Sequence, residues 1–278
     1  MQKSLIQEHC PMIKTSWQVF SQLLRRDLFA FKREYPSKFI YTLFLFFTNV
    51  MVFCYFLPQE GLPKEYAPFF LVGAIASFGF VEVVGKVSVF MADLQGDRTI
   101  SHTLVMPIPS WVVFCYIGIF WALTSALIAI FLFPIGKLFL FTEFDLSLIS
   151  YSRLIPMFIT INIFFGFFAL WLASVIKDMG SINSLWLRYI VPLWMFGAYA
   201  YSWEASYQLS PTVAYFTLIN PMVYVMEGMR AAALGQAGYL PYWVCQTALW
   251  AFIFACTLHA IRRLKRRIRI DSLKPGHL

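Results

Sequence analysis

The side chains in this sequence that could do chemistry are a few charged groups set inside long apolar stretches. Glu82 and Lys86 lie four residues apart, so on a helix they share one face and can form an ion pair. Glu227 and Arg230 lie three residues apart in another apolar stretch, which predicts a second local ion pair. Because charges inside apolar spans are costly, each pair indicates a functional site or a specific packing contact.

Two roles are open for each of these groups. The Glu82–Lys86 pair either neutralises itself within a packed bundle, or lines a substrate entrance and transmits movement from a nearby loop. Arg188, near the start of an apolar stretch, either extends its side chain to the membrane interface or binds an anionic headgroup or pyrophosphate. Glu227 and Arg230 either fix a hairpin or contact the substrate directly.

Enzyme motifs are not visible in the chain. The nearest approach to a phosphate-binding loop places Gly79 and Gly85 before Lys86. It has one residue too many between the glycines, lacks the following Ser or Thr, and sits within an apolar stretch. No H-E-x-x-H, G-x-S-x-G or C-x-x-C motif occurs, and the four histidines are scattered. We therefore expect no catalytic residue, metal site or cofactor in this chain.

The composition is that of a helical membrane protein with several spans. Hydrophobic residues make up 60% of the chain, aromatic residues 19% and charged residues only 13%, which excludes an ordinary soluble domain. The net charge of +8 comes largely from the two chain ends, where basic residues orient membrane helices, so nucleic acid is not an expected partner. The fold class predicted is all-α, with six transmembrane helices. These are 39–57, 67–92, 111–133, 154–176, 185–202 and 241–261.

An amphipathic helix is predicted over 12–38, before the first span. Apolar residues recur there at steps of three and four, and basic residues occupy most of the other faces. Such a helix suits the membrane interface, although an amphipathic helix packed on protein has the same pattern. The apolar positions are Ile13, Trp17, Phe20, Leu24, Leu28, Phe31 and Tyr35.

The basic residues also predict the orientation. Seven Lys or Arg residues precede the first span and seven follow the last, in the tail 262–278, so both termini should be cytoplasmic. Two cytoplasmic ends require an even number of crossings. The stretch 203–240, which contains Pro211 and Pro221, is therefore predicted to be an external re-entrant hairpin and not a seventh span.

Two features of the outer half were predicted in more detail. Asn220 and Pro221 read as the break between two half-helices, with Asn220 as the cap. Aromatic residues gather near the external surface, either as a belt at the lipid interface or as a stacking platform for sugar rings. They are Trp194, Phe196, Tyr199, Tyr201, Trp203, Tyr207, Tyr215 and Phe216.

A short cytoplasmic helix is predicted in the loop 93–110. The loop is polar at first, contains Gly96, and ends in Pro107 and Pro109. A glycine and a Pro-x-Pro stop are typical helix boundaries. A compact helix joining two long spans has the shape needed to push on a partner protein.

The ordered set of these features resembles the membrane subunit of ABC-2-type exporters, a class that includes polysaccharide, lipo-oligosaccharide and drug permeases. The resemblance covers nearly the whole chain. The motifs that carry it are Ile219-Asn220-Pro221-Met222-Val223-Tyr224, Glu227-Gly228-Met229-Arg230, Gly235, Asp97-Arg98-Thr99 and Met106-Pro107-Ile108-Pro109.

The resemblance implies a homodimer in the inner membrane with two nucleotide-binding ATPase subunits docked beneath it. The ATPase subunits, and not this chain, would bind ATP and Mg²⁺. The hairpin would cover the exit between the two copies. The 93–110 loop would be the coupling helix, with Asp97, Arg98, Thr99, His102, Met106 and Pro107 facing the ATPase.

The expected function is therefore ATP-driven export of an amphipathic substrate, with a lipid-linked glycan ahead of a lipid or hydrophobic drug. An ion-coupled secondary transporter is the first alternative, but such carriers usually show internal repeats and paired acidic residues at mid-membrane, which the sequence lacks. A lipid-modifying enzyme is the second alternative. It would need a catalytic cluster, and the external loop offers only Glu204, Glu227 and Arg230, without a nucleophile.

Overall fold

The computed structural model describes residues 2–61, 63, 66–95, 108–140, 149–176, 180 and 184–271, with side chains from residue 17 to residue 266 except at 94 and 95. Every secondary-structure element in these ranges is a helix. Five helices are long and apolar enough to cross a membrane, so an all-helical membrane protein is the fold class. The five are Trp17–Gln59, Tyr66–Asp93, Ser110–Phe139, Tyr151–Val175 and Tyr242–Arg266.

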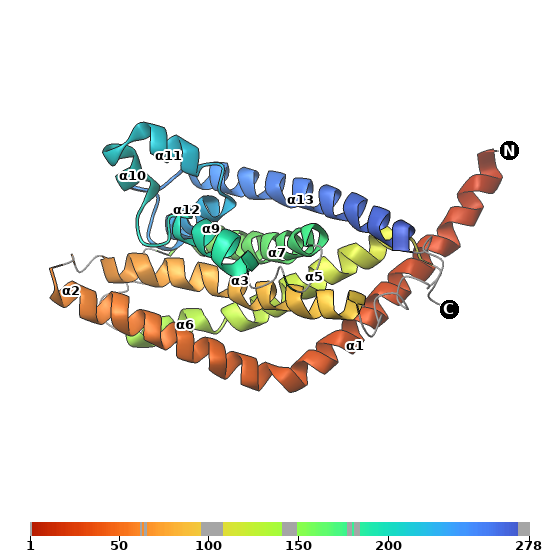
Figure 1. Cartoon of the computed structure of the whole chain (residues 1–278), viewed down its shortest axis with the longest axis horizontal. Coiled ribbons are helices and arrows are strands. Elements are labelled where there is room, and N and C mark those ends of the chain that lie inside the picture. Colours follow the sequence, from red (N-terminus) through yellow and green to blue (C-terminus); the bar gives the residue numbers. More distant parts are fainter. Residues whose placement is uncertain are drawn as a thin grey trace.

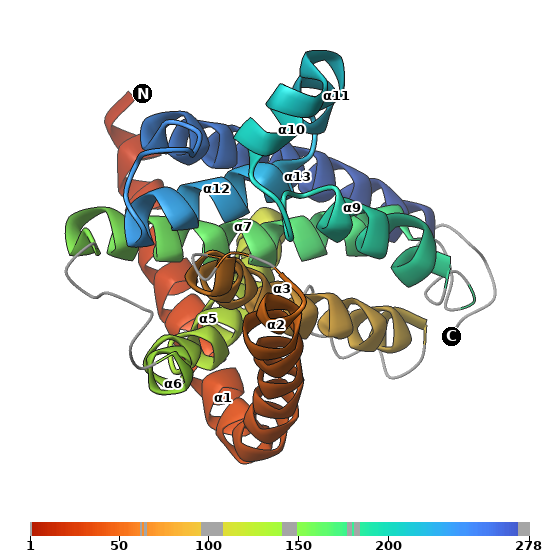
Figure 2. The same cartoon turned by 90° about the vertical axis from the view of Figure 1, so that its left-hand side faces the viewer.

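The centre of the bundle is formed by α3 (Tyr66–Gln95), α5 (Ser110–Ala129) and α7 (Tyr151–Val175). In Figure 2, α7 lies between α13 (Tyr242–Asp271) and the α3–α5 pair, and α1 (Gln2–Val50) lies on the outside. The most apolar window of α3 is 78% buried, whereas that of α1 is 22% buried. The central helices thus supply the protein core, and α1 and α13 leave most of their surface to other contacts.

Two central helices approach each other at backbone distance. A side chain added at Gly166 of α7 would clash with the carbonyl oxygen of Gly118 and the backbone of Ala122, both on α5. Small residues at such positions let membrane helices pack closely without a hydrophobic driving force. The α5–α7 contact therefore depends on the absence of side chains at this crossing.

The first helix differs from its prediction at one boundary. We expected an interfacial helix to end at residue 38 and a span to begin at 39, but α1 is one continuous helix from Gln2 to Val50. It bends part-way along its length (Figure 1), and Pro36, which cannot donate a backbone hydrogen bond, lies within it. The inner face of this helix contacts α5. Asp27 accepts a hydrogen bond from Tyr116, and Tyr35 donates one to the Leu127 carbonyl.

After α1 the chain continues as a π-helix, Met51–Phe56, and a short α2, Leu57–Gln59. The predicted spans 67–92, 111–133, 154–176 and 241–261 correspond to α3, α5, α7 and α13, within a few residues at most ends. The helix α6 (Leu132–Phe139) extends the α5 segment.

The predicted span 185–202 is wrong as a continuous helix. Helical structure covers only 184–195, as the π-helix Trp186–Ile190 and α9 (Val191–Met195), and it is not among the five long helices. The chain then turns at Ala198, which has a φ of 61°. The helix has already ended at Met195, and the left-handed conformation at Ala198 prevents the chain from resuming it. The backbone carbonyls from Ala198 onward are bound by a side chain described below.

Three short helices follow this turn: α10 (Trp203–Leu209), α11 (Pro211–Thr217) and α12 (Pro221–Ala233). Figure 2 shows α10 and α11 standing away from the bundle, whereas α12 packs against it. We call this end of the molecule the cap end.

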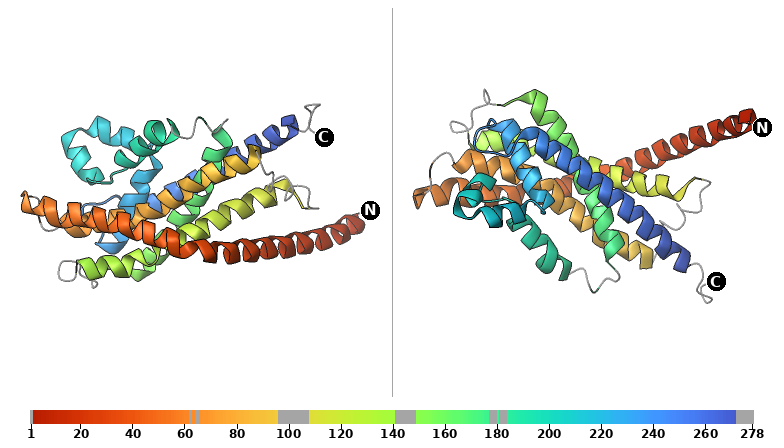
Figure 3. Two further views of the ribbon diagram at one scale, coloured as in Figure 1. Left: turned by 60° about the horizontal axis from the view of Figure 1, so that its bottom comes forward. Right: turned by 90° about the horizontal axis from the view of Figure 1, so that it is seen from above.

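The start of α1 and the end of α13 lie at the opposite end, which we call the terminal end (Figures 1 and 3). The last turn of α3 and the first turn of α5 point to this same end. The predicted coupling helix and its residues 97–107 lie outside the described residues.

Candidate functional site

Arg230, on α12, is the most extensively bonded buried charge in the described part of the chain. Its side chain is fully buried, and its guanidinium donates to the backbone carbonyls of Phe69 (3.1 Å), Ala198 (2.6 Å) and Tyr199 (2.7 Å). A longer bond of 3.4 Å reaches the carbonyl of Tyr201. The guanidinium carbon also lies 3.6 Å from the centre of the Phe69 ring, within the range of a cation–π contact.

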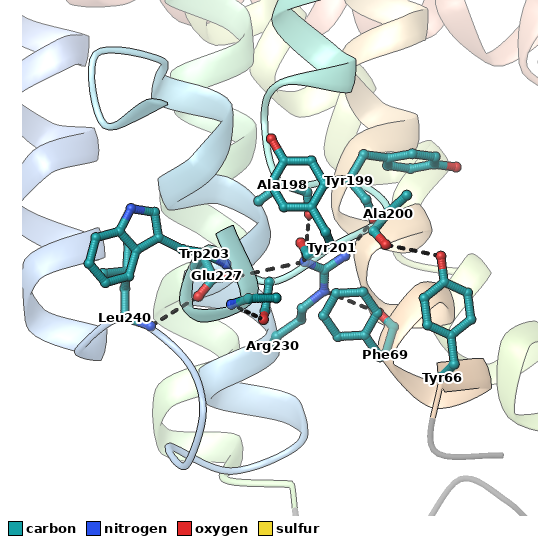
Figure 4. Close-up of polar contacts among 12 residues, drawn as sticks. Tyr66, Phe69, Ala198, Tyr199, Ala200, Tyr201, Trp203, Glu227, Arg230 and Leu240 are labelled. Carbon is teal, nitrogen blue, oxygen red and sulfur yellow. Dashed lines mark hydrogen bonds and ion pairs between the residues drawn. The ribbon is translucent and has the colours of Figure 1, made fainter. Parts of the chain in front are cut away.

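Glu227, one turn before Arg230, accepts two backbone hydrogen bonds. They come from the N–H groups of Trp203 (3.1 Å) and Leu240 (3.0 Å), as Figure 4 shows. The predicted ion pair with Arg230 is present, with 3.9 Å between Arg230 Nη1 and Glu227 Oε1. Each partner has shorter contacts to the backbone, so the two charges are held mainly by peptide groups. We call Arg230, Glu227 and these backbone partners the Arg230 cluster.

Burial shapes the ionisation of both groups, which belong to a helix outside the five long ones. Desolvation raises the pKa of Glu227, while its two N–H donors and Arg230 favour the charged form. Desolvation likewise lowers the pKa of Arg230 to about 10. Arg230 therefore stays positive at neutral pH.

The Arg230 cluster joins three segments that are distant in sequence. Arg230 binds the first turns of α3 through Phe69 and the turn after α9 through Ala198 and Tyr199. Buried carbonyls without a partner are costly, and here one guanidinium satisfies several of them. Since both charged side chains are 0% exposed, the geometry favours the structural role over direct substrate contact.

Asn220 ties the start of α12 to the bundle. Its side-chain oxygen accepts from the Met222 N–H (3.0 Å), which confirms the predicted cap, and Pro221 follows at the first helical position. Its amide nitrogen donates to the Leu193 carbonyl of α9 at 2.6 Å. The break between α11 and α12 is thus anchored on the short helix that replaces the predicted fifth span.

The second group of buried charges lies where α1, α3 and α5 meet. Glu82 and Lys86 pair as predicted, at 3.8 Å, but Lys38 of α1 is closer to the same carboxylate oxygen, at 3.0 Å. Lys38 also pairs with Glu34 (3.2 Å), and Lys86 donates to the Thr124 hydroxyl of α5 (2.7 Å). We call these five residues the Lys86 cluster.

The Lys86 cluster runs from the protein interior to the surface. The side chains of Glu82 and Lys86 are each 11% exposed, whereas that of Glu34 is 64% exposed. The Lys86 ammonium lies 4.8 Å from the Phe31 ring and 4.7 Å from the Phe120 ring, so aromatic faces supply part of its stabilisation. The sequence indicated the Glu82–Lys86 pair but carried no signal for Lys38, which is on another helix.

The remaining predicted residues are dispersed. Arg188 is exposed on the π-helix that precedes α9. Tyr199 is 2% exposed and donates to the side-chain oxygen of Asn49, so it belongs to the protein core and not to a surface belt. The ring of Trp194 contacts Tyr199, with 4.5 Å between centroids.

Other aromatic residues of the predicted group do reach the surface. Trp203, Tyr207 and Tyr215 form a cluster with ring centroids 5.3 to 6.1 Å apart. Phe196 and Phe216 are 63% and 73% exposed, and Tyr201 is partly buried. The predicted aromatic group therefore divides into core residues and an exposed set on the cap end.

The described residues contain no group of three or more His, Cys, Asp or Glu side chains able to hold a metal ion. Comparison with protein-family models, curated proteins and solved structures finds no match for this chain.

Proposed function

We propose that this chain is the membrane subunit of an ATP-driven exporter, paired with a second copy of itself and with two separate ATPase subunits in the inner membrane. The observation that carries the proposal is that the last turn of α3 and the first turn of α5 lie at the same end as the start of α1 and the end of α13. Exposed basic residues lie on α1 and α13, the helices that begin or end there, and the preference of basic residues for the cytoplasmic side supports a cytoplasmic location for that end. Exposed examples are Arg25, Arg26, Lys32, Arg33, Arg262, Lys265 and Arg266.

In this proposal the stretch containing α9 makes the fifth of six crossings together with the turn that follows it. The helical residues 184–195 rise about 18 Å at 1.5 Å per residue, which is less than the hydrocarbon thickness of about 30 Å. The turn at Ala198 supplies the remaining depth. Its carbonyls are bound by Arg230, so irregular backbone there is shielded from lipid, as the membrane requires.

The re-entrant hairpin of the proposal consists of α11 and α12. Asn220, between them, contacts Leu193 in α9, and at the other end of α12 the Ala232 carbonyl accepts from the Ser150 N–H before α7. The 13 residues of α12 span about 20 Å. This length supports a hairpin that enters part of the membrane and returns to the cap end.

The substrate in the proposal is amphipathic, with a lipid-linked glycan favoured over a lipid or hydrophobic drug. Exposed aromatic side chains at the cap end suit contact with sugar rings leaving the membrane. Arg188 is exposed on the helix that starts toward the terminal end, where a cation suits an anionic headgroup or pyrophosphate.

Co-purification tests the proposal. The tagged chain is extracted gently from its native membrane, and a stoichiometric nucleotide-binding subunit is expected with it. Replacing Asp97 or Arg98 by Ala, or placing proline within 99–105, should uncouple transport while the chain still inserts. Glu60→Ala, at the cap end, is the matched control and should transport normally. A chain that emerges alone, with no ATPase in reach of cross-linking, contradicts the proposal.

The Lys86 cluster favours one second candidate, an ion-coupled transporter, because ionisable side chains within spans often mark ion pathways. Collapsing the proton gradient while ATP is kept constant separates the two functions. Export by the ATP-driven complex should continue, and export by an ion-coupled carrier should stop.

A further inference from the structure

A cavity of about 340 Å³ opens at the cap end of the molecule, between α10, the start of α3 and the loop before α13. The buried side chains of Arg230, Glu227 and the Lys86 cluster do not line it. Its lining mixes charged, amide, hydroxyl and aromatic groups with small residues. The residues that matter for the argument are Phe69, Ser202, Glu204, Gln208, Gly238 and Tyr239.

The walls of the cavity are fixed from behind by the Arg230 cluster. Arg230 binds the Phe69 carbonyl and stacks on the Phe69 ring, which in turn is nearly parallel to the Tyr239 ring at 6.3 Å. Glu227 accepts from the Trp203 N–H, between the lining residues Ser202 and Glu204.

The same carboxylate accepts from the Leu240 N–H, directly after Tyr239. Each of the three segments that form the cavity is therefore pinned to one buried ion pair. Binding sites of this kind lose little entropy when a ligand enters, because the walls are already ordered.

The loop wall is shaped by glycine. Gly238 has a φ of 79°, and a β-carbon there would lie 3.5 Å from the Glu204 carboxylate oxygen. That distance is an ordinary van der Waals contact, so the left-handed backbone, and not a lack of space, is the reason that glycine suits this position.

The polar groups suit hydroxyl-rich ligands. Glu204 is exposed and no hydrogen bond or ion pair joins it to another described residue, so its oxygens are available as acceptors. Gln208 offers both a donor and an acceptor, and the Ser202 hydroxyl, which accepts from the Ala205 N–H, still has its own proton to donate. Sugar hydroxyls donate and accept at once, and the adjoining rings offer apolar surface to the sugar carbons.

We propose that this cavity binds a neutral sugar unit. The one charged lining group, Glu204, is negative and disfavours anionic ligands. This inference deepens the proposed function. It rests on the proposed function only in placing the cavity on the outer side of the membrane. Sugar binding itself needs no ATPase.

The test uses the purified full-length chain in lipid nanodiscs, probed by saturation-transfer NMR and titration calorimetry. The probes are maltose, cellobiose, chitobiose, mannobiose and galactobiose, with sialyllactose as the anionic comparison. At least one neutral disaccharide should bind in preference to sialyllactose. Glu204→Lys and Gln208→Ala should each weaken that binding at least tenfold, and Ala205→Trp, which fills the cavity without removing a polar group, should do the same.

Glu60→Lys is the matched control, because it reverses an exposed charge at the same end outside the cavity, and it should bind as the unmodified chain does. The proposal is overturned if no neutral disaccharide binds, or if the three cavity variants bind as tightly as the control. A chain that co-purifies with an ATPase but binds no sugar refutes the cavity alone. A chain that binds sugar but brings no ATPase refutes the exporter assignment alone.

Discussion

The Arg230 cluster and the Lys86 cluster differ in the kind of group that stabilises their buried charges. Both place charged groups inside an apolar helical bundle. In the Arg230 cluster the partners are mainly backbone carbonyls and N–H groups. In the Lys86 cluster the partners are side chains from three helices, ending at the exposed Glu34.

The difference concerns which cluster can rearrange. A peptide group cannot rotate away without moving the main chain, so the Arg230 cluster should hold the cap end rigid. Lysine and glutamate side chains can exchange partners by changing rotamers, so α1, α3 and α5 can shift against one another while their charges stay paired. We therefore expect conformational change at the Lys86 cluster and not at the Arg230 cluster.

The strongest test of this contrast is Arg230→Leu. The substitution leaves Glu227 buried without its cation and several carbonyls without a donor, and removing one member of a buried pair typically costs about 3–5 kcal/mol. Thermal unfolding in detergent, followed by size-exclusion chromatography, should show the largest loss of any substitution discussed here. Arg153→Leu, at an exposed arginine, is the control and should unfold as the unmodified chain does.

A smaller effect is expected for Glu227→Gln. The amide keeps one acceptor oxygen for two backbone donors, so either Trp203 or Leu240 loses its partner, and a hydrogen bond to a charged group contributes about 1.5–3 kcal/mol. Stability should fall while co-purification with the ATPase persists. Loss of the ATPase with stability intact would show that α12 does not lie on the outer side.

Removing opposite charges together should destabilise the Lys86 cluster less than removing its carboxylate alone. Glu82→Gln leaves Lys38 and Lys86 without the carboxylate they share and should cost about 1–2 kcal/mol, because a partly open cluster admits some solvent. Adding Lys86→Met to Glu82→Gln removes one of the two ammonium groups and should recover part of that loss. A double-mutant cycle measures this coupling, and strictly additive effects would contradict a shared cluster.

The smallest effect is expected at the junction of α11 and α12. Asn220→Ala removes the cap of α12 and the bond to Leu193, for which about 1 kcal/mol is typical. Asn220→Asp keeps the cap but not the amide donor, so its unfolding temperature should lie between those of Asn220→Ala and the unmodified chain. Equal unfolding temperatures for all three proteins would mean that the junction of α11 and α12 does not contribute to stability.

The features that could be predicted from the sequence are those set by neighbouring residues within one segment. The spacing of Glu82 and Lys86 within one helix predicted their pairing, and the Asn220-Pro221 step predicted the cap. The long apolar runs predicted the central helices, because lengths and composition alone define such candidates.

Partners supplied by other segments could not be predicted in this way. Lys38 lies 44 residues from Glu82, and nothing in either neighbourhood indicates the contact. The carbonyls bound by Arg230 belong to the backbone, which is the same at every residue and leaves no trace in the sequence. The predicted span 185–202 is helical only as far as Met195 for this reason: its composition suits a helix, but the carbonyls of Ala198 and Tyr199 bind Arg230 and not the N–H groups of a following helical turn.

The order of these partners along the chain has a consequence for biosynthesis. All the carbonyls that bind Arg230 belong to residues 69–201, so the ribosome makes them before it makes the arginine. Chains fold largely from the N-terminus during synthesis. The hydrogen bonds of the guanidinium can therefore form as soon as α12 enters the bundle, and only Glu227 must wait, for Leu240, thirteen residues later.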